Sequence, residues 1–297
     1  MQTTQDVPLK TRAQAIPENA QKMLPPTDGR PPVMHSNEWN QPLPIDAPIN
    51  TAGAEDSPFI TQDGNTLYFF FTPDVHVPVE KQALDGVTGI WVATKNGSAW
   101  NEPTRVVLQE SGKLALDGCE FVQRNRIWFC SAREGYAGIH WFTAESKEGT
   151  WTAWKNAGFP AEYEVGELHF NADGSQVYFH SARQSGKGGL DLWVSSRQGN
   201  LWTEPENLAA LNSAENKGWP FLQQDGSELW FTRTLNGTPA IYRARKEGSS
   251  WNEPELIVSQ FAGEPALDEE GNLYFAHHYY ENGQMIEADL YYAERKN

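Results

Sequence analysis

The sequence predicts an all-β fold, specifically a five-bladed β-propeller of four-stranded antiparallel blades. One observation is a Trp-centred phrase that recurs about every 50 residues, a period typical of propellers and solenoids. A second is that an apolar run follows a turn in every period, and a third is that helical periodicity is almost absent after residue 35. The phrase appears as AWNEP, TWTAW, LWTEP and SSWNEP, around Trp100, Trp151, Trp202 and Trp251.

The first strand of each predicted blade is short and begins after an acidic or glycine-rich step. Five such segments start near residues 55, 117, 165, 217 and 263. They have the sequences EDSPFI, DGCEFV, GELHF, GWPFL and GEPAL.

The second strand is the apolar run, and in four of the five blades it follows a Gly-containing turn (DGNT, DGSQ, DGSE, EGN). Asp-Gly between apolar runs is a strong hairpin signal. The runs are LYFFF, IWFC, VYFH, LWFT and LYFA.

The third strand is an alternating segment, and the fourth carries the Trp phrase. Proline is tolerated on edge strands and disfavoured in central ones, so the phrase belongs on the outer edge of a blade. The third strands are predicted at Gly89–Thr94, Gly138–Ala144, Leu190–Ser196, Ala240–Arg245 and Ala288–Glu294.

A further copy of the phrase, EWNQP at Trp39, precedes the first blade, whereas the last blade reaches Asn297 without one. We therefore expect an N-terminal strand to complete the last blade and protect its edge. The propeller is expected over residues 36–297. Residues 1–35 are expected to be extended or disordered, with a short helix near Ala13–Met23.

The formal net charge of −16 argues against binding to nucleic acid or to anionic lipid surfaces. No apolar run approaches a membrane span, and we expect a monomer. The first 20 residues lack the apolar core of a signal peptide. We expect either a cytosolic protein or an exported one whose signal precedes the printed sequence, with a slight preference for export.

The two cysteines, Cys119 and Cys130, flank one predicted hairpin in a register that lets them face each other across two strands. Two reduced core thiols are the favoured interpretation. A cross-strand disulfide is the alternative, and it would support an oxidising compartment.

The composite repeat resembles the TolB-like, WD40-like repeats known as PD40. Its best single copy is Glu167–Leu208, which contains ELHFNADGSQVYFHSAR, DLWVSS and LWTEPENL. The resemblance covers nearly all of the chain beyond residue 48. It implies a propeller fold, and it implies no single function, because function depends on the site rather than on the fold.

In a propeller the first strands line a central channel, so their starts are expected to converge on one mouth. Several carboxylates together raise one another's pKa or attract a cation, and their oxygens suit Ca²⁺. We therefore expect a mouth that binds a glycan, a cation or a protein partner, and no other cofactor. Its residues are Glu55, Asp56, Asp117, Glu120, Glu164, Glu167, His169, Lys217, Trp219 and Glu264.

The alternative is catalysis, and the sequence leaves open whether the chain is an enzyme. The chain is similar to five-bladed glycoside hydrolases of family 43. That resemblance implies a base at Asp56, a pKa-tuning carboxylate at Glu120, where the family has Asp, and an acid at Glu167. Trp219 would stack on a sugar ring.

Overall fold

The computed structural model describes residues 10–110, 112–152, 154–159 and 166–296. The chain divides into two compact units. The first unit comprises Met1–Asp28, Pro44–Gly158 and His278–Leu290, and the second comprises Gly29–Leu43, Phe159–His277 and Tyr291–Asn297. Each is described by itself below.

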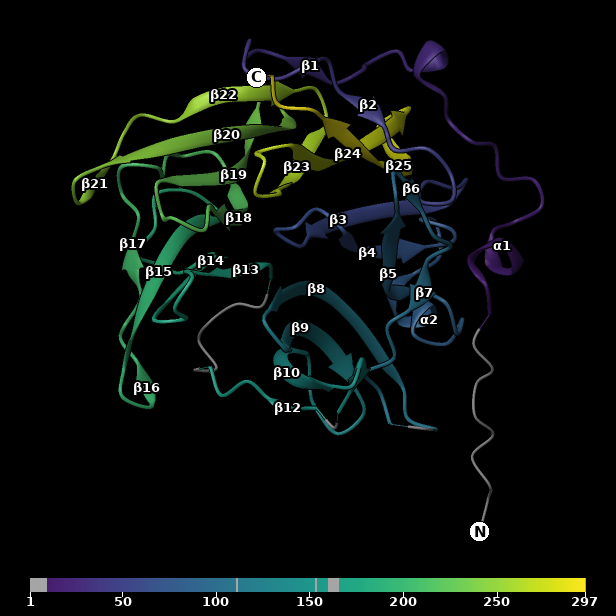
Figure 1. The fold of residues 1–297 in the computed structure, drawn as a ribbon, viewed down its shortest axis with the longest axis horizontal. Coiled ribbons are helices and arrows are strands. Elements are labelled where there is room, and N and C mark those ends of the chain that lie inside the picture. The colour runs from purple at the N-terminus through teal and green to yellow at the C-terminus, as the bar shows by residue number, and fades with distance from the viewer. Residues whose placement is uncertain (1–9, 111, 153, 160–165, 297) are drawn as a thin grey trace. The chain divides into compact units, whose positions relative to one another are not determined.

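Five repeats of three antiparallel strands contain most of the strand residues of the described chain, which confirms the predicted all-β fold class (Figure 1). Repeats one and two lie in the first unit, and repeats three and four lie in the second. The first strands are β3 (Ala54–Ile60), β8 (Ala115–Gln123), β13 (Leu168–Phe170), β18 (Lys217–Leu222) and β23 (Ala262–Leu267).

The second and third strands of each repeat form a long hairpin. The second strands are β4 (Thr66–Thr72), β9 (Arg126–Arg133), β14 (Gln176–Ser181), β19 (Glu228–Leu235) and β24 (Leu273–Glu281). The third strands are β5 (Gly89–Asn96), β10 (Ile139–Lys147), β15 (Asp191–Gln198), β20 (Thr238–Glu247) and β25 (Gln284–Ala293).

The Trp phrase forms two short outer strands rather than one. In each of the first four repeats both strands pair with the third strand of that repeat. Proline has no N–H to donate, so a ladder through the phrase is interrupted. The pairs are β6 (Ala99–Trp100) and β7 (Thr104–Arg105), β11 (Thr150–Trp151) and β12 (Lys155–Asn156), β16 (Leu201–Trp202) and β17 (Glu206–Asn207), and β21 (Ser250–Trp251) and β22 (Glu255–Ser259).

The N-terminal segment supplies the outer strand of the last repeat, as predicted. The strand β2 (Leu43–Pro44) pairs with β25, and Trp39 forms an antiparallel bridge with Arg295. One parallel pairing, Ala288 with Ala54, joins β25 to β3. The strand β1 (Val33–Met34) pairs with β22 of the fourth repeat.

Residues 10–35 run mostly without regular structure, apart from β1, α1 (Arg12–Ala15) and the 3₁₀ helix η1 (Pro25–Thr27). A capping box between Thr11 and Gln14 closes the N-terminus of α1. The single turn of α1 lies at the start of the predicted range Ala13–Met23. A further short helix, α2 (Val79–Gln82), lies between β4 and β5 of repeat one.

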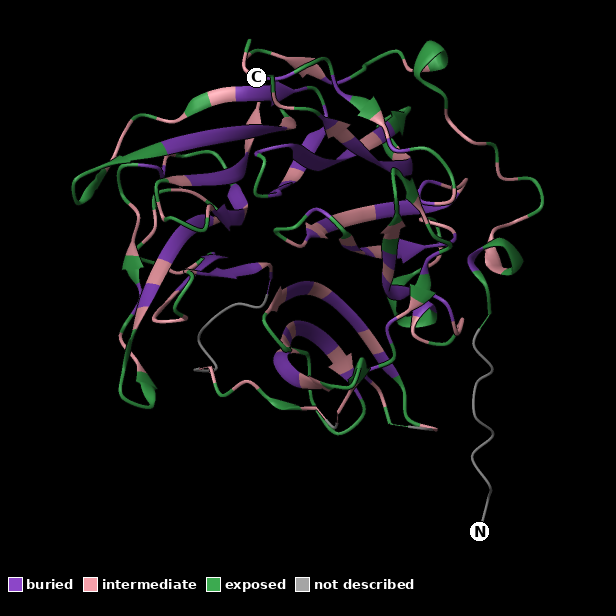
Figure 2. Ribbon diagram, in the orientation of Figure 1, coloured by how far each residue is buried: buried purple, intermediate pink, exposed green. Residues whose placement is uncertain are grey.

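Burial follows the strands, because the alternating apolar side chains face neighbouring repeats. In the second unit one core cluster includes Leu222, Leu229 and Phe231, and in the first unit another includes Ile127 and Phe129. Along β20 the central residues are buried and the end toward Glu247 is exposed (Figure 2).

Candidate functional site

A β-bulge occurs at the same place in four of the five first strands. The register shifts there between Asp56 and Phe59, and likewise at the corresponding residues of β8, β18 and β23. A bulge re-aims the side chain of the extra residue, and bulges are common beside functional sites. The bulge residues, all with positive φ, are Ser57, Cys119, Trp219 and Glu264.

Repeat three has Glu167 at the corresponding sequence position, after Gly166, as Trp219 follows Gly218 and Glu264 follows Gly263. Three of the predicted site residues, Glu167, Trp219 and Glu264, therefore share one position of the repeat. All three belong to the second unit.

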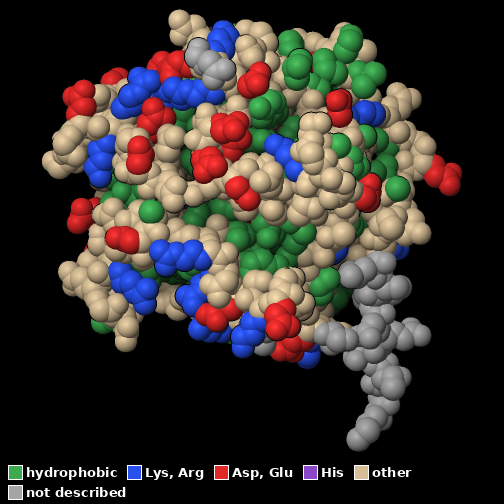
Figure 3. Space-filling view, viewed as in Figure 1, with side chains coloured by type: hydrophobic (Ala, Val, Ile, Leu, Met, Phe, Trp, Pro, Cys, Tyr) green, Lys and Arg blue, Asp and Glu red, His purple; other side chains and the backbone are tan. Residues whose placement is uncertain are grey.

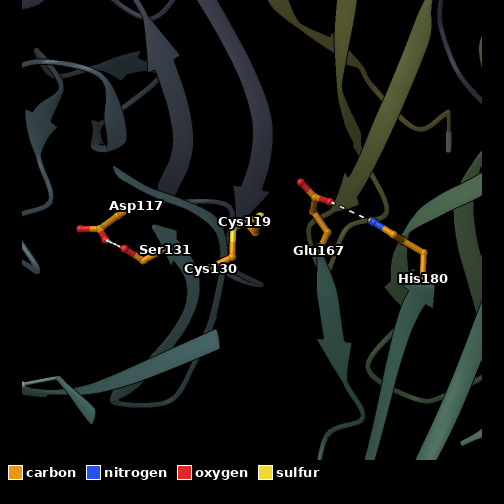
Figure 4. The surroundings of a disulfide bond; sticks show 6 residues. All are labelled: Asp117, Cys119, Cys130, Ser131, Glu167 and His180. Atoms are coloured by element: carbon orange, nitrogen blue, oxygen red, sulfur yellow. Dashed lines mark hydrogen bonds and ion pairs between the residues drawn. A yellow bond between two sulfur atoms is a disulfide. The ribbon is translucent and has the colours of Figure 1, made fainter. Parts of the chain in front are cut away.

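Glu167, His180 and Trp219 lie together in the second unit. The His180 Nε2 atom is 4.0 Å from Glu167 Oε2, and these two side chains are 10% and 23% exposed (Figure 4). The ring centroids of His180 and Trp219 are 5.3 Å apart, and the Trp219 backbone N–H donates to His180 Nδ1 at 3.2 Å. Trp219 is itself partly exposed. A partly exposed carboxylate, a buried imidazole and a partly exposed indole thus lie together.

Two glycines make room for the imidazole of His180. A Cβ on Gly218 would lie 2.9 Å from His180 Nδ1, and a Cβ on Gly166 would collide with His180 Nε2. The ring is therefore wedged between the first strands of repeats three and four, and its orientation is fixed by packing as well as by the hydrogen bond.

Glu55 is held inside the first unit. Its carboxylate accepts hydrogen bonds from the Thr51 hydroxyl at 2.6 Å, the Thr51 N–H at 3.0 Å and Arg12 Nη1 at 3.1 Å. Burial raises the pKa of Glu55 to about 7, against the opposing effects of Thr51 and Arg12. We therefore leave Glu55 out of the proposed site.

Asp117 is also committed to contacts within the first unit. It accepts a hydrogen bond from the Ser131 hydroxyl at 2.6 Å (Figure 4). It accepts a second from Arg133 Nη2, also at 2.6 Å. The Arg133 guanidinium in turn lies 4.3 Å from the ring centroid of Trp154. This arrangement is a buried ion pair packed on an aromatic ring, which suits a structural role.

The other predicted residues have different surroundings. His169 is buried, and its ring centroid lies 4.7 Å from that of Phe221. Burial lowers the pKa of His169 to about 3. Lys217 is buried with Asp191 3.7 Å away, and burial lowers its pKa. Glu120 is buried in β8, and Asp56 pairs with Phe70 in the β3–β4 ladder. Glu164 lies outside the described residues.

Cys119 and Cys130 form a disulfide bond, the less favoured of the two interpretations of the sequence (Figure 4). Their Cα atoms are 5.3 Å apart. The register differs from the predicted one, because Cys119 is the bulge residue and Gly118 pairs with Cys130. Sequence separation alone does not reveal the extra residue.

His180 was not among the residues predicted from the sequence. In repeats one, two, four and five, the residue just before the bulge pairs with a residue of the second strand. These partners are Phe70, Cys130, Thr232 and Ala276. His180 has that position in the run VYFH, so the available signal was a titratable side chain at a mostly apolar place.

The described residues were searched for groups of metal-binding side chains and for helices that could span a membrane. Among the described residues, no group of three or more His, Cys, Asp or Glu side chains could hold a metal ion, so we place no Ca²⁺ site. No described helix is long and apolar enough to cross a membrane.

No protein-family model and no curated protein matches the sequence. Solved structures do resemble it. The endo-arabinase from Bacteroides thetaiotaomicron VPI-5482 matches with a TM-score of 0.52 and 16% identity, over 82% of this chain and 94% of that one. The xylan β-1,4-xylosidase from Bacillus halodurans C-125 matches with a TM-score of 0.50 and 14% identity, over 83% of this chain and 53% of that one.

TolB from Acinetobacter baumannii matches with a TM-score of 0.46 and 11% identity, over 84% of this chain and 56% of that one. The chain thus spans about half the length of the xylosidase and of TolB. At these identities the likeness to the arabinase and the xylosidase concerns the fold alone. It agrees with the β-propeller fold class.

Proposed function

We propose that the chain binds a pentose-containing saccharide at the site formed by Glu167, His180 and Trp219. One observation carries this proposal: a partly exposed indole lies against an imidazole that is itself 4.0 Å from a carboxylate. An apolar ring face with a few fixed polar groups is the usual composition of a small-molecule site.

The chemistry of the three side chains matches that of a sugar. The C–H face of a sugar ring packs on an aromatic surface, and Trp offers a large one. The Glu167 carboxylate accepts hydrogen bonds from hydroxyls, and an imidazole N–H donates to them. Side chains with both kinds of group bind neutral polyols better than they bind anions.

The fold likeness supports the choice of saccharide class. Of the similar structures, one is named an endo-arabinase and another a xylan β-1,4-xylosidase. The net charge of −16 points in the same direction, since it disfavours anionic ligands. Figure 3 shows acidic and basic side chains mixed on the face that it draws.

Isothermal titration calorimetry with xylotriose and arabinotriose tests the proposal. We expect the wild type to bind one of them and Trp219→Ala to weaken that binding at least ~10-fold, because the stacking surface is lost. Trp100→Ala is the matched control, since Trp100 is also partly exposed and stacks on Lys95. Absence of binding by the wild type, or equal loss in both variants, would contradict the proposal.

Hydrolysis of the bound saccharide is a second candidate function. The position of Glu167 favours it, because this carboxylate is mostly buried yet reaches the surface beside His180. Glu167 would then protonate the leaving oxygen.

Release of reducing sugar from xylan and arabinan measures this activity. We expect Glu167→Gln to abolish turnover and to retain binding of the trisaccharide. Glu204→Gln is the control, because Glu204 is an exposed carboxylate paired with Arg183. Unchanged turnover in Glu167→Gln would exclude the acid role.

The disulfide bears on where this function takes place. Disulfides form and persist in oxidising compartments and are rare in the cytosol. The Cys119–Cys130 bond therefore supports an exported protein that meets extracellular or periplasmic saccharides.

A further inference from the structure

We infer that the first unit contains a pocket that binds an arginine side chain of a partner polypeptide, and that Arg12 of this chain is the occupant that the partner displaces. Arg12 belongs to residues 10–28, called the strap below, which precede β1 and the five repeats. The inference is independent of the proposed saccharide function. It rests on the groups around the Arg12 guanidinium and on the way the strap is held.

Hydrogen-bond acceptors surround the guanidinium of Arg12. Its Nη1 atom donates to the Ile49 carbonyl at 2.6 Å and to Glu55 Oε1 at 3.1 Å. Its Nη2 atom donates to the Pro48 carbonyl. The side chains of Arg12 and Glu55 are 2% and 0% exposed. This set fits a planar cation with several fixed N–H donors, whereas the ammonium of lysine is a compact point charge without that planar fork.

Three aromatic rings lie near the same guanidinium. The Arg12 Cζ atom is 5.4 Å from the ring centroid of Phe69, 5.5 Å from that of Phe71 and 5.7 Å from that of Trp91. Aromatic rings attract a cation, and the attraction is larger where water is excluded. Arg12 Nη2 also lies 3.6 Å from Glu102, which is 76% exposed, so the pocket has a carboxylate at its border with solvent.

The apolar side chains of the strap contribute little to its attachment. Arg12 is the one buried residue of residues 10–28, all of which the structure describes. Ile16 and Met23 are partly exposed, and Leu24 is exposed. Burial of apolar surface is the dominant favourable term in most protein association. The strap therefore lacks a large apolar anchor and depends on its cations.

Lys22 makes the second attachment of the strap. Its Nζ atom pairs with Glu287 and with Asp289, whose side chains are each 2% exposed. The Met23 N–H donates to Glu287 Oε2 at 2.8 Å. Burial raises the pKa of Glu287 to about 6 and also raises that of Asp289. Buried carboxylates need a cationic partner, so both attachment points select a basic ligand.

The other buried arginines belong to the strands of the repeats. Among the described residues these are Arg133, the last residue of β9, and Arg243 in β20. Arg12 instead lies on the single turn of α1, outside every repeat. Burial lowers the pKa of Arg12 despite the opposing effect of Glu55, and a buried ion pair adds little net stability. A costly cation on a peripheral segment suits exchange better than permanent attachment.

Binding of a synthetic peptide of residues 10–28 to the full-length protein tests the inference. In the wild type Arg12 competes for the pocket, and Arg12→Ala removes this competitor. We expect the variant to bind the fluorescently labelled peptide at least ~10-fold more tightly than the wild type in fluorescence anisotropy. The same peptide with Arg12→Lys should bind the variant at least ~10-fold more weakly, because lysine lacks the planar fork.

Arg126→Ala is the matched control. Arg126 is a partly exposed arginine of the same unit that pairs with Glu145 and lies 5.6 Å from the ring centroid of Trp128. This variant should bind the peptide as the wild type does. Sedimentation velocity identifies the source of the arginine. A monomeric wild type supports a separate partner, whereas a dimer that the peptide dissociates would assign the arginine to a second copy and overturn the separate partner.

Melting temperatures, measured in parallel, show which variants fold. If Arg12→Ala does not fold, Arg12→Lys replaces it in the same titration, since it keeps the charge. The inference fails if the folded variant binds no peptide, binds it only as well as the wild type, or binds the native and lysine peptides equally. It also fails if neither variant folds and the peptide does not restore folding. These outcomes leave the saccharide titrations unaffected, because those use other residues.

Discussion

At the residue scale, Glu55 is a carboxyl group whose ionised form is disfavoured by burial. It is fully buried, and burial raises its pKa from its ordinary 4.5 to about 7. Between these two values the folded protein retains a proton that the unfolded chain has lost. The contribution of Glu55 to stability is therefore full below pH 4.5 and falls as the pH rises toward 7.

We expect this dependence to disappear in Glu55→Gln, whose amide does not titrate. The free energy of unfolding of the wild type, minus that of the variant, should fall by about 3 kcal/mol between pH 4.5 and pH 7.5. Urea denaturation at a series of pH values measures it. Glu134→Gln, at an exposed ion pair, is the control. A flat difference would show that Glu55 titrates normally.

At the residue scale the sequence identifies positions that repeat, but not how a side chain packs, and the site roles of these residues stay predictions. Glu167, Trp219 and Glu264 share one place in the repeat, and the sequence pointed to all three. Glu55 and Asp117 were predicted in the same way, from the acidic or glycine-rich start of a first strand. Their burial against Arg12 and Arg133 depends on partners that no spacing reveals.

At the scale of elements, the five copies of the Trp phrase have two different roles. Trp100, Trp151, Trp202 and Trp251 are partly exposed, whereas Trp39 is 1% exposed. The ring centroids of Trp39 and Trp230 are 5.4 Å apart, and the Trp39 indole N–H donates to the Gly271 carbonyl at 2.9 Å. Its neighbour Glu38 is hydrogen-bonded to Arg243, which lowers the pKa of Glu38 to about 2.

Trp39→Ala should therefore destabilise the protein by about 3–5 kcal/mol, as expected for removing a buried aromatic side chain. Trp100→Ala should cost less than half of that, because Trp100 is partly exposed. Chemical denaturation of both variants measures the difference. Similar losses would mean that the N-terminal strand holds the last repeat no more tightly than any other outer strand.

The sequence predicted these elements well because their signals are local: Asp-Gly turns, apolar runs and a proline that marks an edge. It did not predict the bulges, because an extra residue such as Cys119 changes the pairing without changing the pattern. The split of the outer strands was not predicted, and it also occurs in repeat two, whose phrase has Trp154 in place of Pro.

At the scale of the whole molecule, the all-β fold and the N-terminal outer strand agree with the prediction, and closure of five blades in one ring stays a prediction. The chemistry proposed for the chain depends on the second unit, where Glu167, just before β13, His180 of β14 and Trp219 of β18 lie together. Asp56 and Glu120, the other carboxylates of the hydrolase candidate, belong to the first unit.

A crystal structure with the bound trisaccharide tests the central claim most directly. We predict a sugar ring over the Trp219 indole, in contact with His180 and Glu167. The same crystal gives the carboxyl separation of Asp56 and Glu167, for which about 5–5.5 Å would suit a retaining hydrolase and about 6.5–9.5 Å an inverting one. A saccharide bound elsewhere, with these three side chains in contact only with protein, would contradict the account.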